Sequence, residues 1–126
     1  MSGSVVHFEI PADEPDRAHG FYREAFGWQI QTGVGGGYSL VSTTPSDDSG
    51  RPAQPGAING GMLSRQHPVT SPVLTIDVPD IESALATIES LGGSTLVGKQ
   101  DVMGMGFSAY FTDTEGNVMG LWQSAT

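Results

Sequence analysis

An internal repeat limits the fold of this chain more than any other feature of its sequence. The segment 5–11 reads Val-Val-His-Phe-Glu-Ile-Pro, and the segment 73–79 matches it position for position as Val-Leu-Thr-Ile-Asp-Val-Pro. Each segment is rich in β-branched residues and leads into a helical pattern. Self-similarity at a fixed offset is typical of duplicated supersecondary units. We therefore expect two similar halves.

The first half reads as a strand, a helix and three further strands. Val6, Phe8 and Ile10 alternate with Val5, His7 and Glu9, and Pro11 is expected to end this strand. The helix that follows should bury an apolar face made of Ala18, Phe21, Tyr22, Ala25 and Phe26, and end at Gly27. Strands are predicted over 28–34, 38–43 and 57–63, with a hairpin turn at Gly35–Gly37 and a mobile polar loop over 44–55.

The second half repeats this order. After the strand 73–78, Asp80 is suited to cap a helix whose apolar face comprises Ile81, Ala84, Leu85, Ile88 and Leu91. Gly92 and Gly93 end the helix, and strands are predicted over 94–98, 107–112 and 117–123. Each half is therefore β-α-β-β-β, an α+β fold. Residues 1–126 form a single domain, with one module over about 4–64 and the other over about 71–124.

Charge and composition exclude several classes of function. The formal net charge is −9, from 14 acidic against 5 basic residues, and Lys99 is the only lysine. Such a chain has no basic patch for nucleic acid or for an anionic membrane surface. It has no cysteine, so disulfides and thiolate chemistry are absent. We see no signal peptide and no membrane-spanning run, and expect a cytoplasmic protein.

Several short motifs together resemble the glyoxalase/bleomycin-resistance (vicinal oxygen chelate) family. One is His7-Phe8-Glu9-Ile10-Pro11 leading into Phe-Tyr-x-x-x-Phe-Gly-Trp at 21–28. Others are Val-Pro-Asp-Ile at 78–81, Leu-Gly-Gly at 91–93, and Asp-Thr-Glu-Gly-Asn-Val-Met-Gly-Leu-Trp at 113–122. Their order and spacing cover nearly the whole chain. The resemblance implies two βαβββ modules whose curved mixed sheet surrounds a cleft, and it implies a homodimer.

The resemblance also implies a divalent metal ion held by His, Glu or Gln from the first and last strands of each module. His7 matches one such position, whereas Thr75, Gly120 and a place near Gly60 match the others. Neither a hydroxyl nor a glycine replaces a charged ligand. There is no Asp or Glu between Asp48 and Asp77, nor after Glu115. We therefore expect no metal in the usual position and no cofactor.

The remaining candidate residues line the predicted cleft. His7 and Glu9 are candidate catalytic residues, as a general base and a carboxylate partner. A flat or apolar ligand would be bound by Trp28, Tyr38, Asp77, Phe107, Tyr110 and Trp122. His19 and His67 are expected at the surface. His7 could equally be a hydrogen-bonded structural residue, Glu9 and Asp77 solvated acids, and the aromatic residues ordinary core.

The leading hypothesis is metal-independent binding of a small, partly apolar molecule, which the protein either sequesters or turns over. A metal-dependent lyase, isomerase or dioxygenase is the alternative that would require ligands not recognised in the sequence. A non-catalytic interaction subunit is a third possibility. The sequence identifies neither the ligand nor a reaction.

Overall fold

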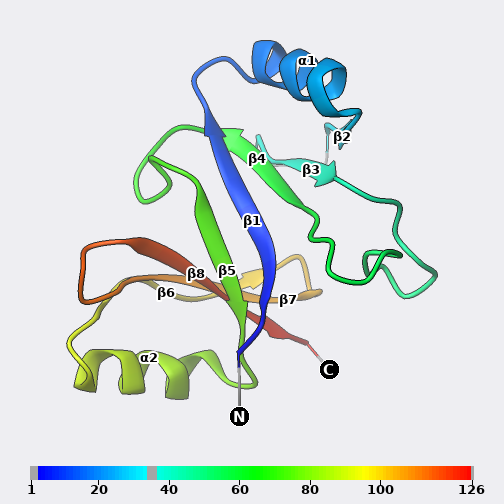
Figure 1. Ribbon diagram of the computed structural model, residues 1–126. Coiled ribbons are helices and arrows are strands. Elements are labelled where there is room, and N and C mark those ends of the chain that lie inside the picture. The colour runs from blue at the N-terminus through cyan, green and yellow to red at the C-terminus, as the bar shows by residue number, and fades with distance from the viewer. Residues whose placement is uncertain (1–2, 34–36, 126) are drawn as a thin grey trace. The chain divides into compact units, whose positions relative to one another are not determined.

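The computed structural model describes residues 3–33 and 37–125, and over these ranges the chain forms two helices and eight strands (Figure 1). It divides into two compact units, one over His7–Pro72 and the other combining the residues up to Val6 with those from Val73 onward. Each repeats the order β-α-β-β-β, as predicted, so the fold is α+β. Within the described ranges, no helix is long and apolar enough to cross a bilayer.

The first module consists of β1 (Val5–Ala12), α1 (Pro15–Phe26), β2 (Gln29–Gln31), β3 (Ser39–Ser42) and β4 (Gly60–Ser64). Its strands lie in the order β2-β3-β4-β1, with β4 parallel to β1 and antiparallel to β3. Pro11 does not end β1 as expected, because Pro11 and Ala12 still pair with β4. Proline lacks only the N–H, and its fixed φ is compatible with an extended chain. Of the predicted turn, Gly35 and Gly36 lie outside the described residues.

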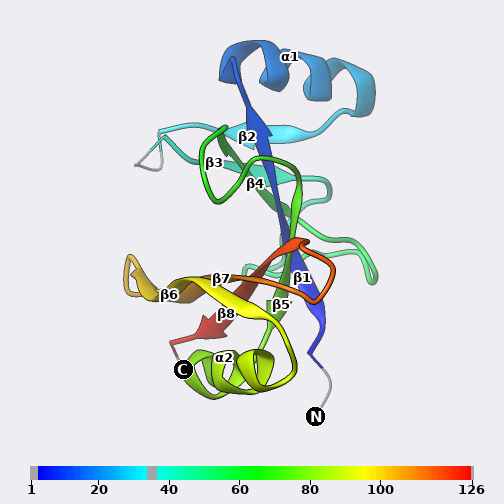
Figure 2. The same ribbon diagram turned by 90° about the vertical axis from the view of Figure 1, so that its left-hand side faces the viewer.

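The second module consists of β5 (Val73–Asp77), α2 (Ile81–Ser90), β6 (Ser94–Val102), β7 (Gly106–Thr112) and β8 (Val118–Ser124). Its strands lie in the order β5-β8-β7-β6, and α2 runs beside them (Figure 2). The helix packs on one face of these strands through a core of five buried residues: Ile81, Leu85, Ala109, Phe111 and Leu121. Burial of this apolar face stabilises the module.

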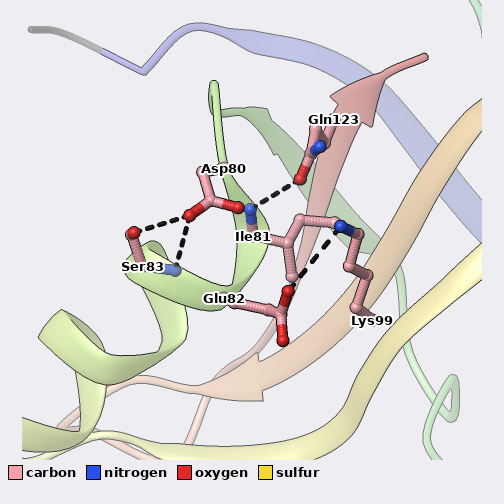
Figure 3. A network of polar contacts seen from close by, with 6 residues as sticks. All are labelled: Asp80, Ile81, Glu82, Ser83, Lys99 and Gln123. Carbon is pink, nitrogen blue, oxygen red and sulfur yellow. Dashed lines mark hydrogen bonds and ion pairs between the residues drawn. The ribbon is translucent and has the colours of Figure 1, made fainter.

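Two side chains accept hydrogen bonds from N–H groups at the N-terminus of α2 (Figure 3). Asp80 accepts hydrogen bonds from the N–H and the hydroxyl of Ser83, as expected of an N-cap. From β8, the side-chain oxygen of Gln123 accepts a hydrogen bond from the N–H of Ile81 at 2.8 Å. Ile81 is completely buried, so water cannot replace this acceptor.

Helix α1 buries a different face from the one that the sequence predicts. Phe21 and Phe26 were expected on its buried face, but 61% and 62% of their surfaces are exposed. The ring of Tyr22 stacks on Trp28, with ring centres 4.8 Å apart. This contact turns the row that contains Tyr22 and His19 toward the core, so His19, expected at the surface, is only 4% exposed. His67 is exposed, as expected.

The long connection between β3 and β4 has hydrogen bonds of its own. The Asp47 carboxylate accepts bonds from the N–H groups of Ser49 and Arg51. At the base of the connection, the Asn59 side-chain oxygen accepts bonds from the N–H groups of Thr43 and Thr44, at 2.7 and 3.2 Å. Asn59 therefore joins the two ends of this loop, in which only mobility was expected.

Candidate functional site

The first module presents His7 and Glu9 on the sheet face that points away from α1. Side chains alternate along a strand, and Phe8 and Ile10 between them pack into the core beneath the helix. Glu9 is buried, with 8% of its surface exposed, and His7 is partly buried. The alternation of the sequence thus placed these two polar side chains on the same face.

His7, on β1, is hydrogen-bonded to a residue just before the start of β3. Its Nε2 atom lies 2.7 Å from the hydroxyl oxygen of Tyr38, which immediately precedes β3. The planes of the two rings differ by 11°, and the ring centres are 6.5 Å apart. Because the lone pair or N–H of Nε2 lies in the imidazole plane, the rings meet edge to edge rather than face to face. His7 and Tyr38 therefore form one hydrogen-bonded unit.

A glycine makes room for this unit. Gly61 on β4 pairs with Glu9 on β1 and with Leu40 on β3, so it lies between Tyr38 and the strand that carries His7. A Cβ atom at Gly61 would overlap the hydroxyl end of the Tyr38 ring. The missing side chain at Gly61 is thus what allows the phenol to extend across β4 to His7.

Burial and charge act in opposite directions on His7. Loss of solvent lowers the pKa of His7 below its ordinary value of 6.5, and this effect is larger than the raising effect of the nearby Glu9 carboxylate. The imidazole is therefore predominantly neutral at pH 7. In that state Nε2 either accepts the Tyr38 proton or donates its own, according to the tautomer.

In the second module, the corresponding sheet face carries Thr75, Asp77, Tyr110 and Trp122. Parallel pairing places Thr75 beside Gly120 and Asp77 beside Trp122, and Tyr110 pairs with Gly120 from β7. Thr75 is buried and Asp77 exposed. The indole of Trp122 extends across Gly106, where a Cβ atom would come within 2.6 Å of its Cη2 atom.

Two predicted ligand-binding residues lie on the opposite face of their module. Trp28 packs against Tyr22 and Phe8 in the core beneath α1. Phe107 packs against the α2 core, and the Lys99 Nζ atom lies 4.4 Å from the centre of its ring. Trp28 therefore lies on the other face of its module from Tyr38, and Phe107 and Tyr110, three residues apart on β7, face opposite ways.

Comparisons with known proteins agree with this fold. The model of the Glyoxalase/Bleomycin resistance protein/Dioxygenase superfamily matches residues 4–121. The chain belongs to this superfamily. A glyoxylase-like domain-containing protein from Didymella fabae is 30% identical over 125 residues, covering 93% of this chain and 91% of the relative.

Solved structures of glyoxalase-fold proteins resemble the chain in fold. A methylmalonyl-CoA epimerase in complex with methylmalonyl-CoA and NH4+ has a TM-score of 0.67 at 16% identity, covering 100% of this chain and 97% of the epimerase. The methylmalonyl-CoA epimerase from Mycobacterium tuberculosis has a TM-score of 0.61 at 15% identity, with 97% and 88% covered. At these identities the likeness concerns the fold alone.

The register of the strands relates the positions where the superfamily resemblance implies metal ligands. Glu9 pairs with Gly61, so two residues earlier His7 lies opposite Asn59, as Thr75 lies opposite Gly120. Asn59 directly precedes Gly60, whose missing side chain faces Phe8. The described part of the chain contains no group of three or more His, Cys, Asp or Glu side chains that could hold a metal ion.

Sequence reasoning missed Gly61 and Asn59. Asn59 follows no recognisable motif, and its role depends on the backbone of Thr43 and Thr44, about fifteen residues away in the sequence. Gly61 belongs to the run Asn-Gly-Gly-Met, which signals a close backbone approach or a bulge within a strand. That signal indicates a crowded position without naming the neighbour.

Proposed function

We propose that this superfamily member binds a small, partly apolar molecule on the helix-free sheet faces of its modules, without the metal ion that the superfamily resemblance implies. The His7–Tyr38 hydrogen bond of 2.7 Å is the observation that carries the proposal. Through this bond, the histidine of the first strand is paired with a second side chain of the protein. A partly buried unit of this kind can orient a polar group of a ligand.

The donor set supports the metal-independent part of the proposal. Gly120 offers no ligand atom, and a side chain added there would start 2.9 Å from the Thr75 hydroxyl oxygen. Thr75 itself offers only a neutral hydroxyl. The Asn59 oxygen already accepts bonds from two backbone N–H groups. Divalent ions are usually held by several charged or imidazole ligands, and the residues at these positions do not fit one.

The helix-free face of the second module offers an apolar surface of its own. Tyr110 and Trp122 share one sheet face, and Trp122 presents a large ring that aromatic or aliphatic ligands can contact. Asp77 lies at the exposed end of the same face. The cleft that the superfamily resemblance implies between the modules, and the homodimer, stay predictions.

Turnover of the ligand would use His7 and Glu9. A neutral imidazole can accept a proton, and the nearby carboxylate stabilises the imidazolium that results. Tyr38 would orient the imidazole in the same way that a carboxylate or carbonyl does in many histidine bases. Sequestration requires only the binding step, so the two outcomes share one site.

The first experiment is to measure the metal content of protein purified without chelators, together with thermal shifts on adding Zn²⁺, Ni²⁺, Mn²⁺ or Fe²⁺. We expect no stoichiometric metal and no stabilisation. A bound ion, or a shift of several degrees with one ion, would refute the metal-independent proposal and favour a metal-dependent lyase, isomerase or dioxygenase.

The second experiment is a screen of small aromatic molecules against the wild type and His7→Ala. Binding should weaken in the variant while its melting temperature stays within a few degrees of the wild type. A large fall in melting temperature with unchanged affinity would make His7 a structural residue, and would refute its role in the site.

A further inference from the structure

We propose that the turn between β6 and β7 is a modification site, at which hydroperoxides convert the exposed thioethers of Met103 and Met105 to sulfoxides while the fold stays intact. This site lies outside the residues to which the proposed function assigns a role. The turn takes up a peroxide before that oxidant reaches the buried thioether of Met62.

Exposure separates the methionines of the chain. Of the four in the described part, Met103 and Met105 expose 67% and 60% of their surfaces. Met62 is only 1% exposed, in the core of the first module, and Met119 packs against the core beneath α2. The sequence has no cysteine, so thioethers are its only sulfur groups. Among these four, a peroxide in solution therefore meets the sulfur atoms of the turn first.

The backbone of the turn adopts a conformation that methionine does not favour. Met103 and Gly104 both have positive φ, 49° and 74°, and the Met105 N–H donates to the Val102 carbonyl oxygen at 2.9 Å. Hairpin turns of this kind usually have Asn-Gly or Asp-Gly at their centre. Neither burial nor backbone preference accounts for a methionine at position 103. A residue that persists against both preferences favours a functional reason for its presence.

The turn is held by hydrogen bonds of its backbone rather than by its methionine side chains. The Met105 carbonyl oxygen accepts a bond from the Ala125 N–H at 3.3 Å, and Asp101 Oδ2 accepts one from the Gly104 N–H at 3.2 Å. A sulfoxide there adds a polar oxygen to a side chain that already faces water. The same change at Met62 would place that oxygen in an apolar core, where a polar group without a hydrogen-bond partner is costly.

The reaction needs no group of the protein other than the thioether. A sulfur lone pair attacks the outer oxygen of the hydroperoxide, so that an S–O bond forms and the O–O bond breaks. The proton of the transferred oxygen passes to the leaving oxygen, which gives a sulfoxide and an alcohol, or water from hydrogen peroxide. Sulfur is oxidised by two electrons and the peroxide is reduced by two. A hydroperoxide is uncharged at pH 7, so the net charge of −9 and the Asp101 carboxylate do not repel it.

The test is peptide mapping of the full chain by mass spectrometry after treatment with hydrogen peroxide, with the sulfoxides of Met62, Met103, Met105 and Met119 followed in time. In the folded protein, Met103 and Met105 should be oxidised at least about tenfold faster than Met62, whose exposed fraction is smaller by more than that factor. Met119 should also react more slowly than the turn. In urea strong enough to unfold the chain, the four rates should be similar.

The double variant Met103→Leu with Met105→Leu is the matched control, because leucine keeps an apolar side chain and removes the sulfur. With peroxide equimolar to the two thioethers, the wild type should carry its sulfoxides mainly at the turn and keep its melting temperature within a few degrees. The double variant, given the same peroxide, should accumulate more sulfoxide at Met62 and Met119, and its melting temperature should fall.

Three results would overturn the inference. Equal rates at the turn and at Met62 in the folded protein would show that the turn gives the peroxide no preferred access. Equal amounts of Met62 sulfoxide in the wild type and the double variant would show that the turn does not take up the oxidant first. A large fall in the wild-type melting temperature while Met62 and Met119 remain reduced would make the turn methionines structural. If the double variant fails to fold, the wild-type map and melting curve decide the question alone.

Discussion

Gln123→Leu should destabilise the protein more than removal of the N-cap side chain of the same helix. The Gln123 oxygen is the acceptor for the N–H of Ile81, at 2.8 Å, and Ile81 has no exposed surface. Leucine keeps much of the bulk of glutamine but has no acceptor. The buried N–H would then lack a partner, which costs about 1–3 kcal/mol of unfolding free energy. We expect a loss of about 2 kcal/mol.

Asp80→Ala is the comparison variant. Its bonds to Ser83 lie at the exposed surface, where water can replace the lost acceptor (Figure 3). Loss of an N-cap side chain typically costs about 1 kcal/mol. Glu82→Gln is the control, because the Glu82 side chain is 76% exposed and lies 3.8 Å from Lys99. A pair of that kind contributes roughly 0–1 kcal/mol, so this variant should change stability least.

Urea unfolding followed by circular dichroism measures the three free energies, and each kcal/mol should also lower the melting temperature by roughly 4 °C. We expect Gln123→Leu to have the lowest unfolding free energy, Asp80→Ala an intermediate one and Glu82→Gln the highest. Gln123→Leu as stable as the wild type, or more stable than Asp80→Ala, would show that the Ile81 N–H finds another partner and would refute the reasoning.

Four other substitutions test the remaining features. Met103 has a φ of 49° at the β6–β7 turn. Met103→Asn should therefore raise the unfolding free energy measured in urea by about 0.5–1 kcal/mol. An unchanged free energy would argue against strain. The buried Nε2 of His19 has no hydrogen-bond partner among the described residues, and His19→Leu should stabilise by about 1–2 kcal/mol in thermal melts; destabilisation would reveal a hidden partner. Burial lowers the folded-state pKa of His7, so the unfolded chain binds the proton first and stability should decline as pH falls below about 6.5; unfolding measured between pH 5 and 8 should lose this decline in His7→Gln. Glu9→Gln should lower the pKa of His7 further in an NMR titration, and a rise would contradict the assigned opposing charge.

The fold could be predicted because its signals are local. Gly27 adopts the left-handed conformation, with φ of 71°, that a helix C-terminus favours, and Asp80 caps α2 as its position before an apolar pattern suggests. The duplicated strand-and-proline segments identified both modules. Strand ends were less accurate, since β6 runs to Val102 rather than to residue 98.

The site could be predicted only in part, because it depends on how neighbouring strands are aligned. Alternation within β1 is enough to place His7 and Glu9 together. The partner of His7 is 31 residues away, and no sequence pattern states which residue of β3 lies beside which residue of β4. Phe107 is a different case: it lies three residues before Tyr110 on β7, so alternation along that strand already places the two on opposite faces.

The two modules differ at a pair of positions that their repeat makes equivalent. Gly61 lies opposite Glu9, and Trp122 lies opposite Asp77, the equivalent acid. On β3, Gly61 pairs with Leu40, and Tyr38 lies two residues before Leu40. On β7, Trp122 pairs with Ser108, and Gly106 lies two residues before Ser108. The modules have thus exchanged a large and a small residue at the same place.

The exchange reverses the direction in which the aromatic ring extends. In the first module the ring of Tyr38 extends from β3 across β4 toward β1, and it ends on His7. In the second, the indole of Trp122 extends from β8 across Gly106 on β7, away from β5 and Thr75. A hydroxyl beside an imidazole suits a polar group, and a bare indole face suits an apolar one. The duplicated halves of one fold therefore differ in chemistry according to which strand carries the glycine: one face holds a polar pair and the other an apolar ring.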